Sequence, residues 1–273
     1  MRLGDERESS NFEDRRGSGF GGPLVIGGGG LGLVGIVVAL LLGVNPADLI
    51  QSGPEPAPTQ APGAPRPDDP DVSFSRKVLA STEDVWTSVL GARGQAYGPP
   101  VLVVYDEITP TGCGTGQAAM GPFYCPQDQK LYLDMAFFRE LSSRFGATGD
   151  FARAYVIAHE VGHHVQNLIG EDHGGGSRSV GAGGGSVRTE LQADCYAGIW
   201  ANKAKNRLEP GDIQEGLGAA SAVGDDTLQK QTQGRVAPDA FTHGSSAQRM
   251  RWFTRGYESG RLEDCDTFSA ATL

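Results

Sequence analysis

The sequence has few of the features that a nucleic-acid-binding protein needs. Its 273 residues include 23 Lys and Arg against 33 Asp and Glu, for a formal net charge of −10. No segment carries the cluster or stripe of basic side chains that phosphate contacts require. The composition therefore argues against a nucleic acid as partner.

Charge is absent from residues 24–44, which read LVIGGGGLGLVGIVVALLLGV. As a helix, these 21 residues would be roughly 31 Å long, close to the hydrocarbon thickness of a bilayer. A cleaved signal peptide is the alternative, but GVNPADLI follows the run without an A-x-A cleavage pattern. We expect an uncleaved transmembrane helix.

Basic residues are also absent for a long stretch after this run. Four arginines precede it (Arg2, Arg7, Arg15 and Arg16), and the next basic residue is Arg66. The positive-inside rule then predicts a single-pass protein of the cell membrane, with a cytoplasmic N-terminus and the remainder extracytoplasmic.

The chain has no internal repeat, and its composition divides it into four parts. Residues 1–23 form the cytoplasmic segment and 24–44 the transmembrane helix. Residues 45–71 are Pro-rich, and a composition that cannot bury a core predicts a disordered linker. Residues 72–273 have the composition of a globular domain.

Cysteine is scarce: Cys113, Cys125, Cys195 and Cys265. Four cysteines allow three pairings, and in a cytosolic protein they would be reduced thiols. An extracytoplasmic domain favours disulfides. We expect a local Cys113–Cys125 bridge, and a Cys195–Cys265 bridge that ties the C-terminal tail to the helix carrying Cys195.

Hydrophobic spacing predicts a few strands followed mostly by helices, which indicates an α+β domain. Strands are expected at 101–105 and 130–133. Helices are expected at 75–90, 135–145, 150–168, 189–204, 212–223 and 245–258. The helix at 150–168 has Asp150 as its predicted cap and Gly170 as its stop.

The stretch AYVIAHEVGHHVQNL contains His159-Glu160-Val161-Gly162-His163, an H-E-x-x-H pattern. Histidines at i and i+4 share one helix face and can bind one Zn²⁺ ion. Glu160 is then placed to act as the base that activates a water. The alternative is a chance match in which hydrogen bonds satisfy both histidines.

A catalytic zinc site needs a third protein ligand. A third histidine six residues after the second is lacking, since residue 169 is Ile and residue 166 is Gln. Glu190 is the better candidate, and Asp194, one turn later, can accept the free N–H of a ligand histidine. The alternatives are a solvated acidic face, disfavoured by the apolar residues around Asp194, and His173 as the ligand.

Three further residues are considered for other roles. His164 is rotated about 100° from His163 on the helix and should point away from the metal. His243 is a candidate to stabilise an oxyanion, with Tyr155 second. For His243, a role in helix capping or packing is an equal alternative.

The H-E-x-x-H and E-x-x-x-D patterns resemble the gluzincins, the zinc peptidases typified by thermolysin. SSNFEDRRG, GPFYCP, YVIAHEVGHHVQ, ELQADCYAG and THGSSAQRMRWF together resemble the bacterial family of neutral zinc metallopeptidases. The resemblance implies a zincin-like fold with a small sheet, an active-site helix and a helical C-terminal half that supplies the third ligand. It also implies a substrate-binding edge strand, here within residues 112–133.

Together these features predict a membrane-anchored peptidase that hydrolyses a peptide or protein through a zinc-activated water and a Glu base. Two alternatives stay open: a catalytically silent zincin that binds peptides or scaffolds an envelope complex, and a purely structural zinc protein. Substrate and oligomeric state do not follow from the sequence.

Overall fold

The computed structural model describes residues 1–17, 69–117, 121–143, 146–170 and 179–273. Within these ranges it is a mixed α/β protein with two small sheets and seven α-helices. The strands are β1 (Phe12–Asp14), β2 (Val101–Tyr105), β3 (Ile108–Thr111), β4 (Gly114–Gln117), β5 (Phe123–Cys125) and β6 (Lys130–Asp134). The helices are α3 (Pro70–Gly91), α4 (Ala136–Ser143), α5 (Asp150–Ile169), α6 (Gly185–Lys203), α7 (Asp212–Ala222), α8 (Asp225–Gln233) and α9 (Ser246–Ser259).

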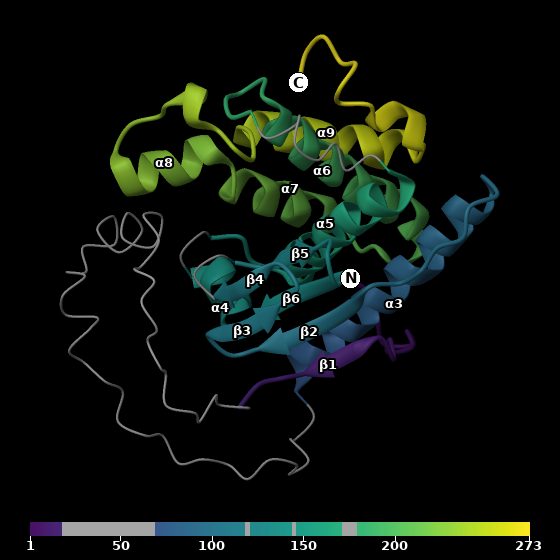
Figure 1. Cartoon of the computed structure of the whole chain (residues 1–273). Helices are drawn as coiled ribbons and strands as arrows, with labels where there is room; N and C mark the ends of the chain where they lie inside the picture. Colours follow the sequence, from purple (N-terminus) through teal and green to yellow (C-terminus); the bar gives the residue numbers. More distant parts are fainter. Residues whose placement is uncertain (18–68, 118–120, 144–145, 171–178) are drawn as a thin grey trace, which may run out of the picture.

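The larger sheet has the strand order β1-β2-β6-β5. β1, β2 and β6 are parallel, and the edge strand β5 is antiparallel to β6. β3 and β4 form a separate antiparallel hairpin. In Figure 1, α5 lies between the larger sheet and a helical layer made of α6, α7 and α9. α5 is therefore the element through which the two halves of the domain meet.

Local signals explain where several helices begin and end. Asp69 caps α3 by accepting hydrogen bonds from the N–H groups of Asp71 and Val72, and Pro70 takes the first helical position. Ser245 and Gln248 form a capping box at the start of α9. Gly170 ends α5 in the left-handed conformation, with φ of 75°.

Some elements differ from the sequence-based expectation. α3 begins five residues earlier than the predicted helix at residue 75, because Asp69 and Pro70 form a start signal that hydrophobic spacing does not register. Asp150 does not cap α5: the cap is Gly149, and Asp150 is the first helical residue. α8 was not predicted, since its sequence DDTLQKQTQ has almost no apolar side chain. α6 begins at Gly185, four residues before the helix expected at 189–204.

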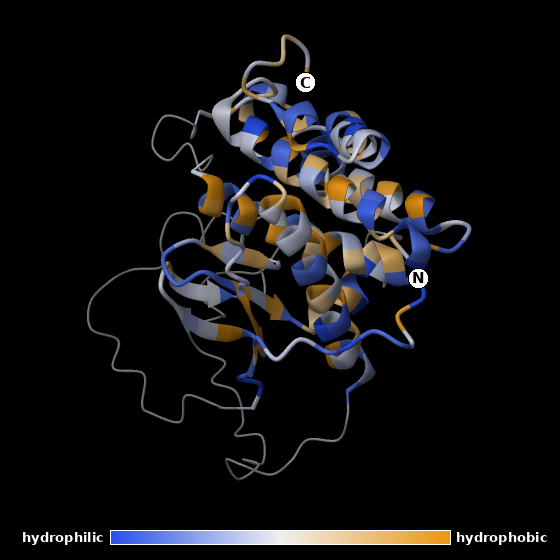
Figure 2. Ribbon diagram, turned by 90° about the vertical axis from the view of Figure 1, so that its right-hand side faces the viewer, coloured by the Kyte–Doolittle hydropathy of each residue, from blue (hydrophilic) through white to orange (hydrophobic). Residues whose placement is uncertain are grey.

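The helical layer is packed closely enough to need glycine at its crossings. A Cβ atom on Gly256 of α9 would lie 1.9 Å from the carbonyl oxygen of Cys195 on α6. The Cys195–Cys265 disulfide joins α6 to the turn that follows α9, and Cys113–Cys125 joins the β3–β4 hairpin to β5. Both predicted pairings are thus present. Hydrophobic residues gather on the faces that the helices turn toward their neighbours (Figure 2).

The N-terminal residues differ most from the predicted division of the chain. Residues 1–17 were expected to be separate from the globular domain, but β1 is a strand of its larger sheet. α3 also brings residues 70–71 of the expected linker into the domain. The predicted transmembrane helix at 24–44 lies outside the described residues, as does linker 45–68. No helix in the described ranges combines the length and apolarity of a bilayer span.

Candidate metal centre

Two helices carry the predicted metal ligands, and a glycine lets them approach each other. His159 and His163 are on α5, and Glu190 is on α6. A Cβ atom at Gly162, between the two histidines, would lie 2.9 Å from the carbonyl oxygen of Ala193 on α6. A larger residue at position 162 would push α6 and its carboxylates away from the imidazoles.

The structure brings the three side chains to a common point. One carboxylate oxygen of Glu190 (Oε2) lies 3.1 Å from Nε2 of His159 and 3.6 Å from Nε2 of His163. One ligand atom from each of the three residues lies within 4.8 Å of the others. Ligand atoms at tetrahedral corners about 2.0–2.1 Å from zinc would lie about 3.3 Å apart. The set therefore has the chemistry and spacing of a zinc site.

The charges around the site favour a cation at this point. Burial alone would lower the pKa of His159, but Asp194 and Glu190 raise it to about 9. Burial opposes ionisation of Glu190, yet His163 and His243 hold its pKa well below the usual range. Two ionised carboxylates thus face the imidazoles, and a divalent metal would satisfy them in place of protons.

Glu160 follows His159 on α5 and is almost fully buried, with 9% of its surface exposed. Burial raises the pKa of its carboxyl group, and the nearby histidines oppose that rise. Among the described residues, none forms a hydrogen bond with this carboxylate. Glu160 is therefore free to exchange a proton with a water or a substrate.

His159 is held from behind by a buried charged network, defined here as Asp194, Arg249 and Tyr155. Nδ1 of His159 lies 2.8 Å from Oδ1 of Asp194. Arg249 on α9 donates to both carboxylate oxygens of Asp194, at 2.9 and 3.0 Å. Burial works against the ionised Asp194, but Arg249 and His159 lower its pKa to about 2. By holding Nδ1, Asp194 turns Nε2 of His159 toward Glu190. This is the role that the sequence predicts for Asp194.

The network also settles where Tyr155 lies, and the position differs from the expectation. Its hydroxyl donates to Asp194 and accepts from Arg249 on the Nδ1 side of His159, away from Glu190. The side chain is only 1% exposed, and burial keeps its pKa well above the usual value. Because its hydroxyl is buried and bonded to both Asp194 and Arg249, Tyr155 is not placed to donate to an oxyanion. Its side chain supports the charged network instead.

His163 is held by a neutral amide network, defined here as Gln166, Gln192 and the Thr189 carbonyl. Nδ1 of His163 lies 2.8 Å from Oε1 of Gln166. The Gln166 amide nitrogen donates to the Thr189 carbonyl and to Gln192, both at 2.8 Å. The amide therefore orients Nε2 of His163 toward Glu190.

His164 has a structural role, as its helix position predicted. Nε2 lies 2.6 Å from the Gly98 carbonyl oxygen, and Nδ1 lies 3.0 Å from the Tyr124 hydroxyl on β5. Burial lowers its pKa to about 4, so it is neutral near pH 7. The histidine ties α5 to the edge strand of the sheet. His173, the rival third ligand, lies outside the described residues.

His243 lies in the loop before α9 and is held by Asp225, the first residue of α8. The N–H groups of Thr242, His243 and Gly244 all donate to one oxygen of Asp225. Nδ1 of His243 lies 3.3 Å from the other oxygen. The charge of Glu190 raises the pKa of His243, so the imidazole is within electrostatic reach of the metal ligands.

Sequence reasoning missed Arg249, Gln166 and Asp225. Gln166 had a local signal, since residues at i and i+3 are neighbours on a helix and it follows His163 at that spacing. Arg249 and Asp225 lie far from their partners in the chain, and no spacing rule connects them.

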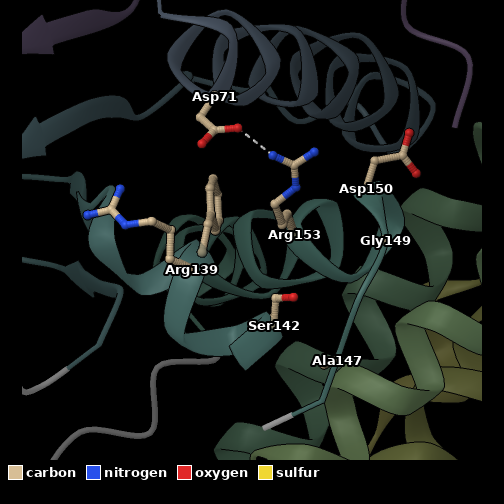
Figure 3. Close-up of a pocket in the computed structure, with 8 residues that line it drawn as sticks. Asp71, Arg139, Ser142, Ala147, Gly149, Asp150 and Arg153 are labelled. Atoms are coloured by element: carbon tan, nitrogen blue, oxygen red, sulfur yellow. Dashed lines mark hydrogen bonds and ion pairs between the residues drawn. The ribbon is translucent and has the colours of Figure 1, made fainter. Parts of the chain in front are cut away.

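A separate hollow of about 510 Å³ opens beside α4 and the start of α5. Figure 3 shows Arg139, Arg153 and Asp71 around it, with an ion pair between Arg153 and Asp71. Asp150, at its rim, bonds with the Met1 amino group. The carboxylates of Asp71 and Asp150 are therefore engaged in ion pairs within the fold, which leaves neither as a free acid or base in this hollow.

Comparisons with known proteins identify the family of this chain. A family model described as "Putative neutral zinc metallopeptidase" matches residues 1–268. The chain is 45% identical to the uncharacterized protein YpfJ of Escherichia coli K12, across 98% of this chain and 99% of YpfJ. It is also 45% identical to the uncharacterized protein Rv2575 of Mycobacterium tuberculosis H37Rv, across 86% of each. No solved structure matches it. The chain belongs to the putative neutral zinc metallopeptidase family.

Proposed function

We propose that this chain is a zinc-dependent peptidase with one Zn²⁺ ion held by His159, His163 and Glu190. The convergence of two imidazoles and one carboxylate beside an unpartnered Glu160 supports this function above all. The family and the paired support for both histidines agree with it.

A zinc ion held by His159, His163 and Glu190 would supply a Lewis acid able to acidify a water and polarise a peptide carbonyl. The carboxylate of Glu160 accepts the proton that the water loses and later donates it to the leaving amine. The raised pKa of Glu160 suits both steps, because a stronger base accepts the proton more readily and a buried acid delivers it without exchange with solvent.

His243 is the proposed donor to the oxyanion that forms at the substrate carbonyl. Its Nδ1 faces Asp225, which leaves Nε2 as the donor. His243→Ala should lower kcat about 10²–10³-fold with little change in zinc content. Equal kcat values in the variant and the wild type would limit His243 to a structural role.

The central test is Glu160→Gln, which removes the base but leaves the three ligands in place. The variant should bind zinc like the wild type and lose cleavage of a peptide library by orders of magnitude, read by mass spectrometry with and without chelator. Glu190→Gln should instead lose zinc. Glu258→Gln on exposed α9 surface makes the same charge change and should do neither.

Two outcomes would reject parts of this assignment. If Glu160→Gln cleaves as fast as the wild type, Glu160 is not the base. If zinc-loaded wild type cleaves no peptide while the ligands still bind zinc, the silent zincin is the better description. Membrane anchoring through residues 24–44 is a further prediction from the sequence, independent of these experiments.

A further inference from the structure

The first 17 residues form an integral part of the domain that holds the metal centre. β1 pairs with β2 in parallel register, with Phe12 opposite Leu102 and Asp14 opposite Val104. The backbone bonds Leu102 N–H to Asn11 O and Arg15 N–H to Val104 O extend the pairing at both ends. Figure 1 shows β1 beside β2 at the edge of the sheet.

Side chains of this segment are also buried against the domain. Leu3 is 6% exposed and belongs to the main hydrophobic core. Ser9 is fully buried, and its hydroxyl donates to Glu83 on α3, as does the side-chain amide of Asn11. A buried carboxylate with these partners requires the N-terminal segment, because without it Glu83 would lose these two donors and its ion pair with Arg7.

The arginines that suggested a cytoplasmic N-terminus are engaged within this fold. Each contacts the rest of the domain. Arg2 and Arg15 donate hydrogen bonds to the backbone carbonyls of Asn206 and Pro110. Arg7 forms ion pairs with Glu83 and Asp84, and Arg16 forms one with Asp69. Their presence before the apolar run has a structural explanation and is no longer independent evidence for orientation.

The two ends of residues 18–68 are held at one place. The Gly17 N–H donates to Asp106, just after β2, and the Arg16 guanidinium pairs with Asp69, the cap of α3. A single passage of residues 24–44 through a bilayer would leave residues 1–17 and 69–273 on opposite faces. That arrangement is incompatible with the β1–β2 pairing in one molecule.

We propose that residues 1–17 and 69–273 lie on the same side of any membrane this protein contacts, with β1 as a permanent strand of the domain. Whatever contact residues 24–44 make with lipid, they do not leave the two ends of the chain on opposite faces. The proposal replaces the predicted cytoplasmic location of the N-terminus, and it holds whether or not the domain is a peptidase.

Impermeant maleimide labelling of full-length protein tests the sidedness. Asp5→Cys and Glu258→Cys each place one free thiol at an exposed position, while all four native cysteines are in disulfides. In spheroplasts of a bacterial host, we expect both positions to be labelled, because the disulfides indicate an oxidising compartment. Equal labelling, or equal protection until lysis, supports the proposal. Labelling of one position before lysis and of the other only after it would overturn the proposal.

A protease site inserted between residues 60 and 61 of the full chain gives a second measurement. After cleavage in native detergent buffer, the N-terminal fragment should stay with the domain during gel filtration. The double variant Arg7→Glu, Arg16→Glu puts like charges against Glu83, Asp84 and Asp69 and should lose this co-elution. Arg235→Glu, a single charge reversal at an exposed site, is the control and should retain it. Immediate separation of the fragments of the unmutated, cleaved chain would contradict a permanent β1.

Discussion

The two halves of the metal centre hold their histidines in different ways. His159 is backed by an ionised carboxylate whose charge is balanced by Arg249 from α9. His163 is backed by the neutral amide of Gln166, which lies on its own helix. The His159 side chain is 8% exposed and the His163 side chain 18%.

This difference shows which partners a buried carboxylate and a buried amide each need when they support a histidine. Asp194 is fully buried, and an ionised carboxylate there is tolerated only with a positive partner at hydrogen-bond distance. Supplying that partner requires a third helix, so the charged network joins α5, α6 and α9. An amide needs only neutral hydrogen bonds, which Gln192 and the Thr189 carbonyl supply from α6 alone.

The largest effect should come from breaking the charged network. Arg249→Met leaves Asp194 buried without its cation and should lower the free energy of unfolding of the zinc-free protein by about 3–5 kcal/mol. Urea denaturation at pH 7 measures this. The double variant with Asp194→Asn removes both charges and should be more stable than Arg249→Met alone. Destabilisation equal to the sum of both single variants would show that the residues are not coupled.

The next largest effect should be on the affinity for zinc. Asp194→Asn removes the carboxylate behind His159 and should weaken zinc binding about 10–100-fold. Competition with a chromophoric chelator measures the affinity. The double variant should recover stability without recovering zinc affinity, because Nδ1 of His159 still lacks its carboxylate. If zinc affinity recovers together with stability, the network has no separate role in orienting the histidine.

The smallest effect is expected on the His163 side. Gln166→Leu removes the acceptor for Nδ1 and one donor each from the Thr189 carbonyl and Gln192, for a loss of about 1–3 kcal/mol of stability. Zinc binding should weaken less than in Asp194→Asn, since a neutral acceptor raises the basicity of the imidazole less than a carboxylate. Gln214→Leu on exposed α7 surface is the control. A zinc loss as large as that of Asp194→Asn would erase the distinction between the halves.

Features carried by short stretches of sequence were predictable. The α5 helix, its stop at Gly170 and the positions of His159 and His163 on one face follow from neighbouring residues and helix geometry. β2 occupies the predicted residues because a run of β-branched side chains is a local property. Glu190 and Asp194 were found through their spacing and their apolar surroundings.

Features that join distant segments were not predictable in this way. Tyr155 has the spacing of a residue on the metal face, yet Arg249, 94 residues later, draws its hydroxyl to the other side of His159. β1 consists of three residues with no apolar alternation, and only its pairing with β2 makes it a strand.

The sequence by itself determined the ligand types, their helical spacing and the candidate base, because each depends on residues within one or two turns of a helix. The tertiary structure decided which groups stand behind those ligands and that residues 1–17 belong to the domain. Hydrogen bonds and ion pairs between distant segments depend on how helices and strands pack, and no short stretch of chain encodes that packing.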